Sequence, residues 1–156
     1  MSGKFEIIAG IEILVTFAPM KQTGDLFRKL QLALAYFIAT GAGVGCLMMW
    51  QDPTGVRYGM DVLLAQLREA FPFAASLFTD LYPSAVALLL VNGLPNLLSI
   101  YLLHRHHAGA SGSTLTCGLL LLGWILVEFY AWGFNGMSVA FALLAGCQIA
   151  LSAKIR

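Results

Sequence analysis

The stretch that decides the fold is residues 119–146, which read LLLLGWILVEFYAWGFNGMSVAFALLAG. Two apolar runs flank a turn at Phe134, Asn135 and Gly136, and the first run carries one charged residue, Glu128. A helix that crosses the hydrocarbon core of a membrane needs about 20 mainly apolar residues. The sequence therefore predicts two spanning helices, residues 115–132 and 134–152, which their short connection makes antiparallel neighbours.

The composition of the whole chain agrees with this interpretation. Of the 156 residues, 59% are hydrophobic and 11% are charged, and the mean hydropathy is +0.80. Soluble domains average about 25% charged residues, so the composition indicates an integral membrane protein. A net charge of +1 provides no strongly basic face, and we expect membrane lipids rather than nucleic acid as partners.

Two further uncharged segments, residues 30–50 and 83–103, are also long enough to span a membrane. We therefore expect an all-α membrane protein with a four-transmembrane-helix bundle over residues 30–156. Residues 1–29 form an N-terminal interfacial or cytoplasmic segment in this prediction. Its apolar part, residues 5–18, contains two glutamates and would reach only about 21 Å as a helix. Whether it spans, lies on or leaves the membrane stays open.

Lysine and arginine residues predict the orientation, because they are enriched in cytoplasmic loops. With four spans, the favoured arrangement places both termini in the cytoplasm. Seven basic residues then lie inside and two outside. The inside set is Lys4, Lys21, Arg28, Lys29, Arg105, Lys154 and Arg156, and the outside set is Arg57 and Arg68.

Residues 51–82 form the outer loop in this arrangement. The loop opens with Asp52-Pro53-Thr54-Gly55, a composition typical of a type I turn. Apolar residues then recur with helical spacing, which predicts a short amphipathic helix that lies on the outer leaflet or caps the bundle and ends at Pro72. These residues are Met60, Leu63, Leu64, Leu67 and Phe71.

Glu128 is the first candidate for function. At the rise of an α-helix, it lies about 9 Å below the outer turn. An ionisable group at that depth normally faces the bundle interior or water. It could handle a proton or cation, or anchor a ligand pocket. The favoured interpretation is a protonated carboxyl that forms a hydrogen bond between helices, with Asn92 as the nearest amide in depth.

Asn92, Asn96 and Ser99 share one face of the second span, which Gly93 and Pro95 are expected to kink. Together with Glu128, these three residues form a candidate polar pocket. The favoured alternative is that the amides satisfy the kinked backbone and bond across helices.

Helix packing explains the small residues best. Gly41 and Gly45 form one small-xxx-small pair, and Ala142 and Gly146 form a second. We predict no catalytic, cofactor-binding or metal residues. The three cysteines lie singly in apolar stretches, and the cluster of His104, His106 and His107 has no carboxylate or cysteine nearby in sequence. His104 and Arg105 fit interfacial anchors.

The chain resembles a family of small bacterial four-helix membrane proteins, loosely DoxX-like, over about residues 30–152. The matching pieces are residues 52–55, 58–60, 71–73, 83–93 and 123–128. The resemblance implies a four-span bundle with a short outer amphipathic segment. We expect the protein to lie in the bacterial cytoplasmic (inner) membrane. It brings no established activity and no catalytic residues.

The function expected from the sequence is a non-enzymatic structural or interaction component of the cell envelope. Self-association or another membrane protein would supply the partner, and no cofactor is expected. Two alternatives stay open. One is a transporter or channel component that uses a polar pocket at Glu128, Asn92 and Asn96. The other is a lipid- or quinone-binding membrane enzyme.

Overall fold

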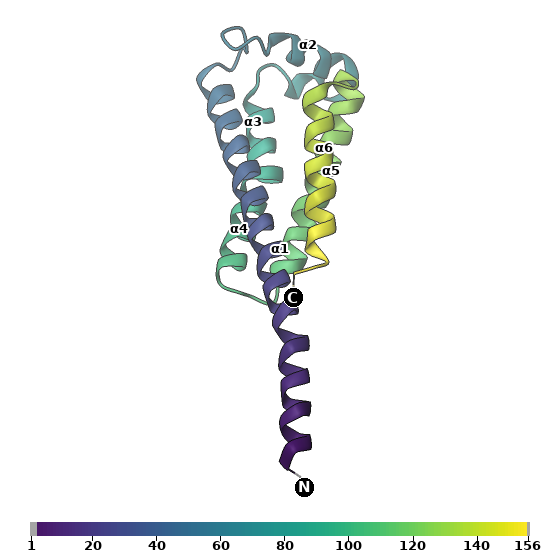
Figure 1. Ribbon diagram of the computed structural model, residues 1–156. Coiled ribbons are helices and arrows are strands. Elements are labelled where there is room, and N and C mark those ends of the chain that lie inside the picture. The colour runs from purple at the N-terminus through teal and green to yellow at the C-terminus, as the bar shows by residue number, and fades with distance from the viewer. Residues whose placement is uncertain (1–2, 156) are drawn as a thin grey trace.

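The computed structural model describes residues 3–155, and it describes side chains from Gly24 onward. Over these residues every regular element is a helix, and turns and short loops connect the helices (Figure 1). The elements in order are α1 (Gly3–Gln51), α2 (Asp61–Ala70), the 3₁₀ helix η1 (Pro72–Leu77), α3 (Tyr82–Leu88), the π-helical segment η2 (Leu89–Gly93), α4 (Leu94–His104), α5 (Ala110–Trp132) and α6 (Gly136–Ser152).

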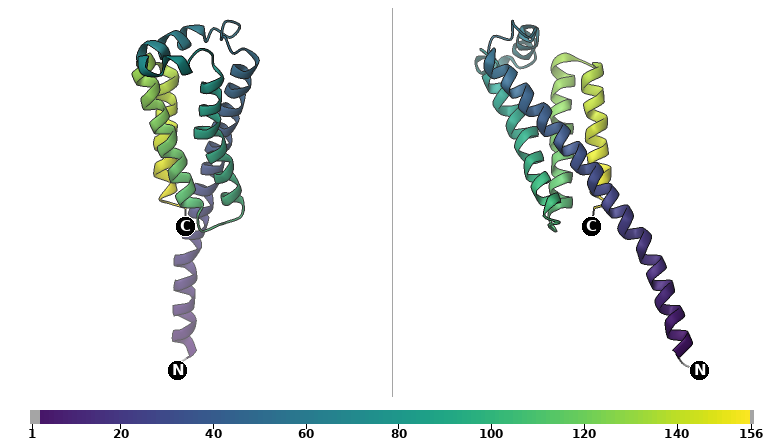
Figure 2. Two further views of the ribbon diagram at one scale, coloured as in Figure 1. Left: turned by 180° about the vertical axis from the view of Figure 1, so that it is seen from behind. Right: turned by 60° about the vertical axis from the view of Figure 1, so that its left-hand side comes forward.

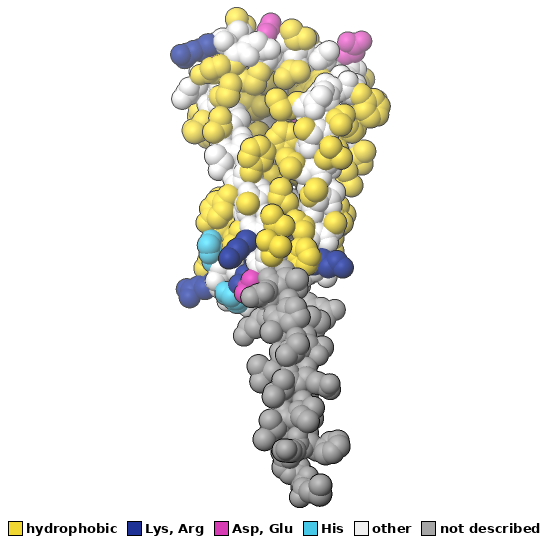
Figure 3. Space-filling view, in the orientation of Figure 1, with side chains coloured by type: hydrophobic (Ala, Val, Ile, Leu, Met, Phe, Trp, Pro, Cys, Tyr) yellow, Lys and Arg dark blue, Asp and Glu magenta, His cyan; other side chains and the backbone are white. Residues whose placement is uncertain are grey.

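Three helical stretches are apolar and long enough to cross a membrane: Gly24–Gln51, Tyr82–His104 and Ala110–Trp132. Helix α6 is apolar but shorter, with 17 residues, or about 25 Å. On the face seen in Figure 3, charged side chains gather at the two ends of the described part, and the shaft between them is apolar. This distribution is that of a membrane protein, as the composition predicts.

Helices α5 and α6 lie side by side, and the continuous rod of α3, η2 and α4 packs against α1 (Figures 1 and 2). Helix α2 and η1 lie across the end of the molecule at which α1 and α5 finish (Figure 1). Helix α1 runs without a break through residue 30, so the predicted boundary between residues 29 and 30 is not a helix end. The interfacial placement predicted for residues 5–18 depends on side chains outside the described residues.

The turn between α5 and α6 forms where the sequence predicts it. Gly133 adopts a positive φ of 71°, a conformation that side chains disfavour, and this ends α5. The side chain of Asn135 then accepts a hydrogen bond from the backbone N–H of Ser138 and caps α6. A glycine stop followed by an asparagine cap explains how so few residues reverse the chain.

The second apolar rod changes its helical form at the position where Pro95 was expected to distort it. Residues Leu89–Gly93 take the wider π-helical form directly before the proline. Proline has no N–H to donate, and its ring clashes with the preceding turn of an α-helix. A wider turn removes that conflict, and π-helical insertions in α-helices often lie at such positions.

Close contact between α5 and α6 depends on a glycine that the sequence analysis did not single out. A side chain on Gly118 would meet Ile149 Cγ1 at 2.7 Å and the backbone oxygen of Ala145 at 3.2 Å. Of the four predicted packing positions, Gly45 lies against Leu88 of α3. Gly41 and Gly146 have open space beside them, and Ala142 packs at the edge of the core around Ile125 and Ala145.

Candidate functional site

A cavity of about 340 Å³ lies beneath α2 and η1. Its walls come from the ends of α1, α3 and α5, and its cover comes from α2 and η1. Cavities of this size hold small organic molecules. The lining residues are almost all apolar or aromatic: Met49, Met60, Leu63, Leu67, Phe71, Phe73, Ala74, Phe78, Leu81, Pro83, Ser84, Ala87, Trp124, Val127, Glu128, Ala131 and Trp132.

The apolar stripe predicted in the loop faces this cavity. Leu64 and Leu67 of α2 are buried, and Met60, Leu63 and Phe71 line the pocket wall with Leu67. Helix α2 therefore turns its apolar side toward α5 instead of presenting it outward. It ends at Ala70, and Pro72 begins η1, in agreement with the predicted stop.

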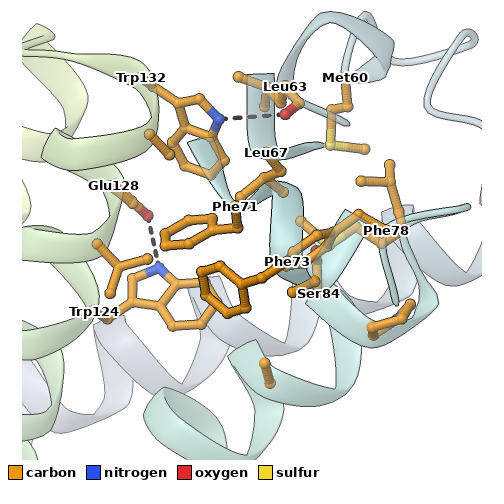
Figure 4. A pocket seen from close by; sticks show the side chains of 17 residues that line it. Met60, Leu63, Leu67, Phe71, Phe73, Phe78, Ser84, Trp124, Glu128 and Trp132 are labelled. Atoms are coloured by element: carbon orange, nitrogen blue, oxygen red, sulfur yellow. Dashed lines mark hydrogen bonds between the residues drawn. The ribbon is translucent and has the colours of Figure 1, made fainter. Parts of the chain in front are cut away.

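Two contacts hold the cover against α5. The indole N–H of Trp132 donates to the backbone oxygen of Leu63 across 3.3 Å, as Figure 4 shows. The ring of Phe71 lies 5.4 Å, centroid to centroid, from that of Tyr130. Both contacts join the last turns of α5 to the segment that closes the pocket.

Arg68 fixes the shape of the cover itself. Its guanidinium donates hydrogen bonds to the backbone oxygens of Phe78 and Thr79, the second at 2.7 Å. These bonds fold the segment after η1 back onto α2. The positive charge of Arg68 is therefore bound to carbonyl groups of the cover, and Arg68 does not line the pocket.

The turn at residues 52–55 connects the cover to α1. The backbone N–H of Gly55 donates to the oxygen of Asp52, and Gly55 has a φ of +76°. The buried Asp52 carboxylate accepts hydrogen bonds from the Thr54 hydroxyl and the Arg57 N–H, each at 2.7 Å. The Thr54 hydroxyl and these backbone N–H groups hold the pKa of Asp52 below its ordinary value of 3.8, against the opposing effect of burial.

Glu128 lies on the α5 wall of the pocket, and its hydrogen-bond partners differ from the one expected. Its Oε1 accepts from the indole N–H of Trp124 at 2.7 Å, and its Oε2 accepts from the hydroxyl of Ser138 at 2.6 Å. Asn92 is not among its partners. The bond to Ser138 joins α5 to α6. Glu128 therefore forms a hydrogen bond between helices, as expected, but its partner is Ser138 and not Asn92.

The α6 cap supplies further hydrogen bonds to Ser138. Asn135 Oδ1 accepts from the backbone of Ser138, so Asn135 Nδ2 is the atom that donates to the Ser138 oxygen, at 3.0 Å. The Ser138 proton is then free to point at Glu128. Both oxygens of Glu128 accept hydrogen bonds, one within α5 and one from α6.

Asn96 forms the two kinds of hydrogen bond expected of a structural amide in the second span, one to the distorted backbone and one across helices. Its Nδ2 donates to the backbone oxygen of Asn92 at 2.8 Å, in the distorted turn before Pro95. Its Oδ1 accepts from Gln148 Nε2 of α6 at 2.9 Å. Asn92, Asn96 and Ser99 are all buried, but none of them lines the pocket with Glu128. The structure therefore does not bring the four predicted pocket residues together.

Gln31 and Gln148 were missed by sequence reasoning, although both are fully buried. Gln148 is the only amide side chain within α6, Gln31 lies at the start of the apolar part of α1, and no spacing marks either residue. Five buried polar atoms have no hydrogen-bond partner within the described part of the chain. They belong to Gln31 (Nε2 and Oε1), Asn92 (Oδ1), Ser99 (Oγ) and Gln148 (Oε1).

The described side chains contain no group of three or more His, Cys, Asp or Glu residues that could hold a metal ion. The histidines at the opposite end bind protein groups: His104 contacts the Tyr36 hydroxyl at 3.0 Å, and His106 contacts Arg28. The chain matched no family model, no curated protein and no solved structure. The resemblance to DoxX-like proteins therefore stays a prediction.

Proposed function

We propose that this chain is a four-span membrane protein that binds an apolar, membrane-soluble small molecule in the pocket beneath α2 and η1. It acts by binding rather than by catalysis, as a non-enzymatic interaction component of a bacterial cytoplasmic membrane. Helix α6 is the fourth span, α2 lies on the outer side, and both termini are cytoplasmic. A distant relationship to DoxX-like proteins belongs to the same proposal.

The pocket is the observation that carries the proposal. A partly open pocket of about 340 Å³ with nearly all its lining apolar favours an apolar ligand over water, since its walls offer water few hydrogen-bond partners. It suits an alkyl or aromatic chain that enters from the hydrocarbon core.

Saturable quenching of tryptophan fluorescence tests this proposal. The chain has three tryptophans, and two of them, Trp124 and Trp132, line the pocket. The Trp50→Phe variant is placed in phosphatidylcholine nanodiscs and titrated with a brominated decanol. The fluorescence of Trp124 and Trp132 should then fall to a plateau. A linear response, equal to that of free indole in the same nanodiscs, would contradict the proposal.

Two filled-pocket variants and one control make the test specific. Ala131→Phe and Ala87→Phe place a ring in the cavity from opposite walls, and each should abolish the saturable component. Ala140→Phe adds the same ring at an exposed position of α6 and should leave saturation intact. Saturation that survives both pocket variants would place the bound probe elsewhere.

A further inference from the structure

We infer that the bundle contains a second site, separate from the apolar pocket, which binds a row of water molecules between α1, α4 and α6. This polar site extends from the middle of the bundle toward the end opposite the cover. It shares no residue with the pocket and does not depend on the proposed function. Five neutral polar residues form it: Gln31, Asn92, Asn96, Ser99 and Gln148.

Four of these side chains form one buried group. Asn96 connects it, because its Nδ2 donates to the backbone oxygen of Asn92 and its Oδ1 accepts from Gln148 Nε2 of α6. Ser99 follows Asn96 by one turn on the same face of α4, and it lies against Cys117 of α5. None of the four is more than 2% exposed. Polar groups of η2, α4 and α6 therefore meet inside the bundle.

Gln31 extends the group to α1. It is fully buried and lies two turns before Ile38, on the face of α1 that packs into the core of the bundle. The next residue, Leu32, packs against the cluster that contains Leu103. Leu103 follows Ser99 by one turn on α4. Gln31 therefore lies in the bundle interior at the end of the polar site that is farther from the cover.

Five polar atoms of these residues need a partner that the described part of the chain does not supply. They are Nε2 and Oε1 of Gln31, Oδ1 of Asn92, Oγ of Ser99 and Oε1 of Gln148. A buried polar atom without a hydrogen bond is costly, and neither lipid nor apolar side chains can provide one. Because the five atoms come from facing helices, ligands shared between the helices satisfy them best.

Water is the ligand whose chemistry fits all five atoms, because it both donates and accepts hydrogen bonds. A metal cation would bind only the oxygens, would leave Gln31 Nε2 unpaired, and would find no carboxylate among these side chains to balance its charge. An alkyl chain would pair with none of them. Asn92 and Ser99 are separated by about 10 Å along the helix axis, so more than one water molecule is needed to reach both.

X-ray radiolysis of the protein in phosphatidylcholine nanodiscs tests for this water, because it converts water into hydroxyl radicals that oxidise the side chains beside it. Two native cysteines serve as probe and control. Cys117 is 1% exposed and lies against Ser99, whereas Cys46 is 6% exposed and lies about 22 Å from Gln31 along α1. Mass spectrometry of peptides should show Cys117 oxidised about fivefold faster than Cys46. Equal rates, or a faster rate at Cys46, would overturn the inference and leave the proposed function in place.

Two substitutions then assign the water to the polar site. Ser99→Ala removes the hydroxyl beside Cys117, and Gln31→Leu replaces a polar side chain with an apolar one of similar volume. Each should lower the oxidation rate of Cys117 about threefold. Thr116→Val is the matched control, because the Thr116 hydroxyl is exposed and bonds to its own helix. An unchanged rate in both site variants, or an equal loss in the control, would contradict the inference. The comparison of the two cysteines in the unsubstituted chain decides the matter even where a variant does not fold.

Discussion

The indole N–H of Trp132 donates a hydrogen bond to the backbone oxygen of Leu63, which joins the last turn of α5 to the first turn of α2 across 69 residues of chain. Near it, Phe71 packs against Tyr130. Both contacts attach the cover to the α5 wall of the pocket. The cover therefore should open when this attachment is weakened, while the packing of α5 on α6 persists.

Trp132→Phe tests that attachment. The substitution keeps a smaller aromatic ring in the pocket wall and removes the donor, so we expect the attachment of the cover to weaken by about 1 kcal/mol. Amide hydrogens of α2 and η1 should exchange faster with solvent, and those of α6 should not change. Trp50→Phe is the control, because Trp50 is exposed and contacts Tyr82 rather than the cover. Equal exchange in α2 for both variants would show that the bond does not hold the cover.

The turn at Asp52 predicts a dependence of cover stability on pH. Its pKa is lowered in the folded protein, mainly by the Thr54 hydroxyl, so the ionised carboxylate stabilises the fold. That stabilisation is fully present above the ordinary pKa of 3.8 and is lost as the pH falls through the lower folded value. Thermal unfolding of the unsubstituted chain and of Asp52→Asn should differ by a constant amount at neutral pH. The difference should shrink below about pH 4. A difference that grows on acidification would contradict this assignment.

The local features of the fold could be predicted because each has a local cause. Proline at position 95 removes a donor, the Asp52–Gly55 composition makes a turn, and Asn135 caps a helix, whatever the helices pack against. The stripe on α2 could also be predicted, because this helix has one polar and one apolar side.

The rotation of the long helices could not be predicted in the same way. In an apolar helix that lies among apolar neighbours, lipid-facing and protein-facing sides have similar composition, so periodicity does not indicate the buried face. Gly118 lies in a close contact and Gly41 faces open space, yet nothing in the sequence separates them. The same ambiguity hid Gln148 and paired Glu128 with Asn92 in the prediction, whereas the structure pairs it with Trp124 and Ser138.

Asn96 and Gln148 should behave as a coupled pair. Asn96→Leu leaves Gln148 Nε2 and the Asn92 backbone oxygen without the bonds they now make, and Gln148→Leu leaves Asn96 Oδ1 unpaired. Each single variant should therefore be destabilised, by about 1–3 kcal/mol. The double variant should be less destabilised than the sum of the two, by about 0.6 to 2 kcal/mol.

Unfolding by sodium dodecyl sulfate in mixed micelles measures this coupling. Asn96→Leu combined with Leu143→Ala is the control, because Leu143 is exposed on α6 and does not take part in the bond. That pair should be additive to within about 0.5 kcal/mol. Additivity in the Asn96–Gln148 pair as well would mean that the bond contributes nothing to the association of α4 with α6.

Two glycines on α5 provide the sharpest test of its packing. A methyl group on Gly118 would lie 2.7 Å from a side-chain carbon of Ile149, and 3.1 Å from its backbone nitrogen, which cannot move without shifting α6. Gly118→Ala should therefore destabilise the protein by about 1–3 kcal/mol. Gly123→Ala introduces the same group five residues along, where nothing lies within 4 Å, and should be neutral or stabilising by up to about 1 kcal/mol, because alanine favours the helix. Equal effects of the two substitutions in the same unfolding assay would contradict a close approach of α5 and α6 at Gly118.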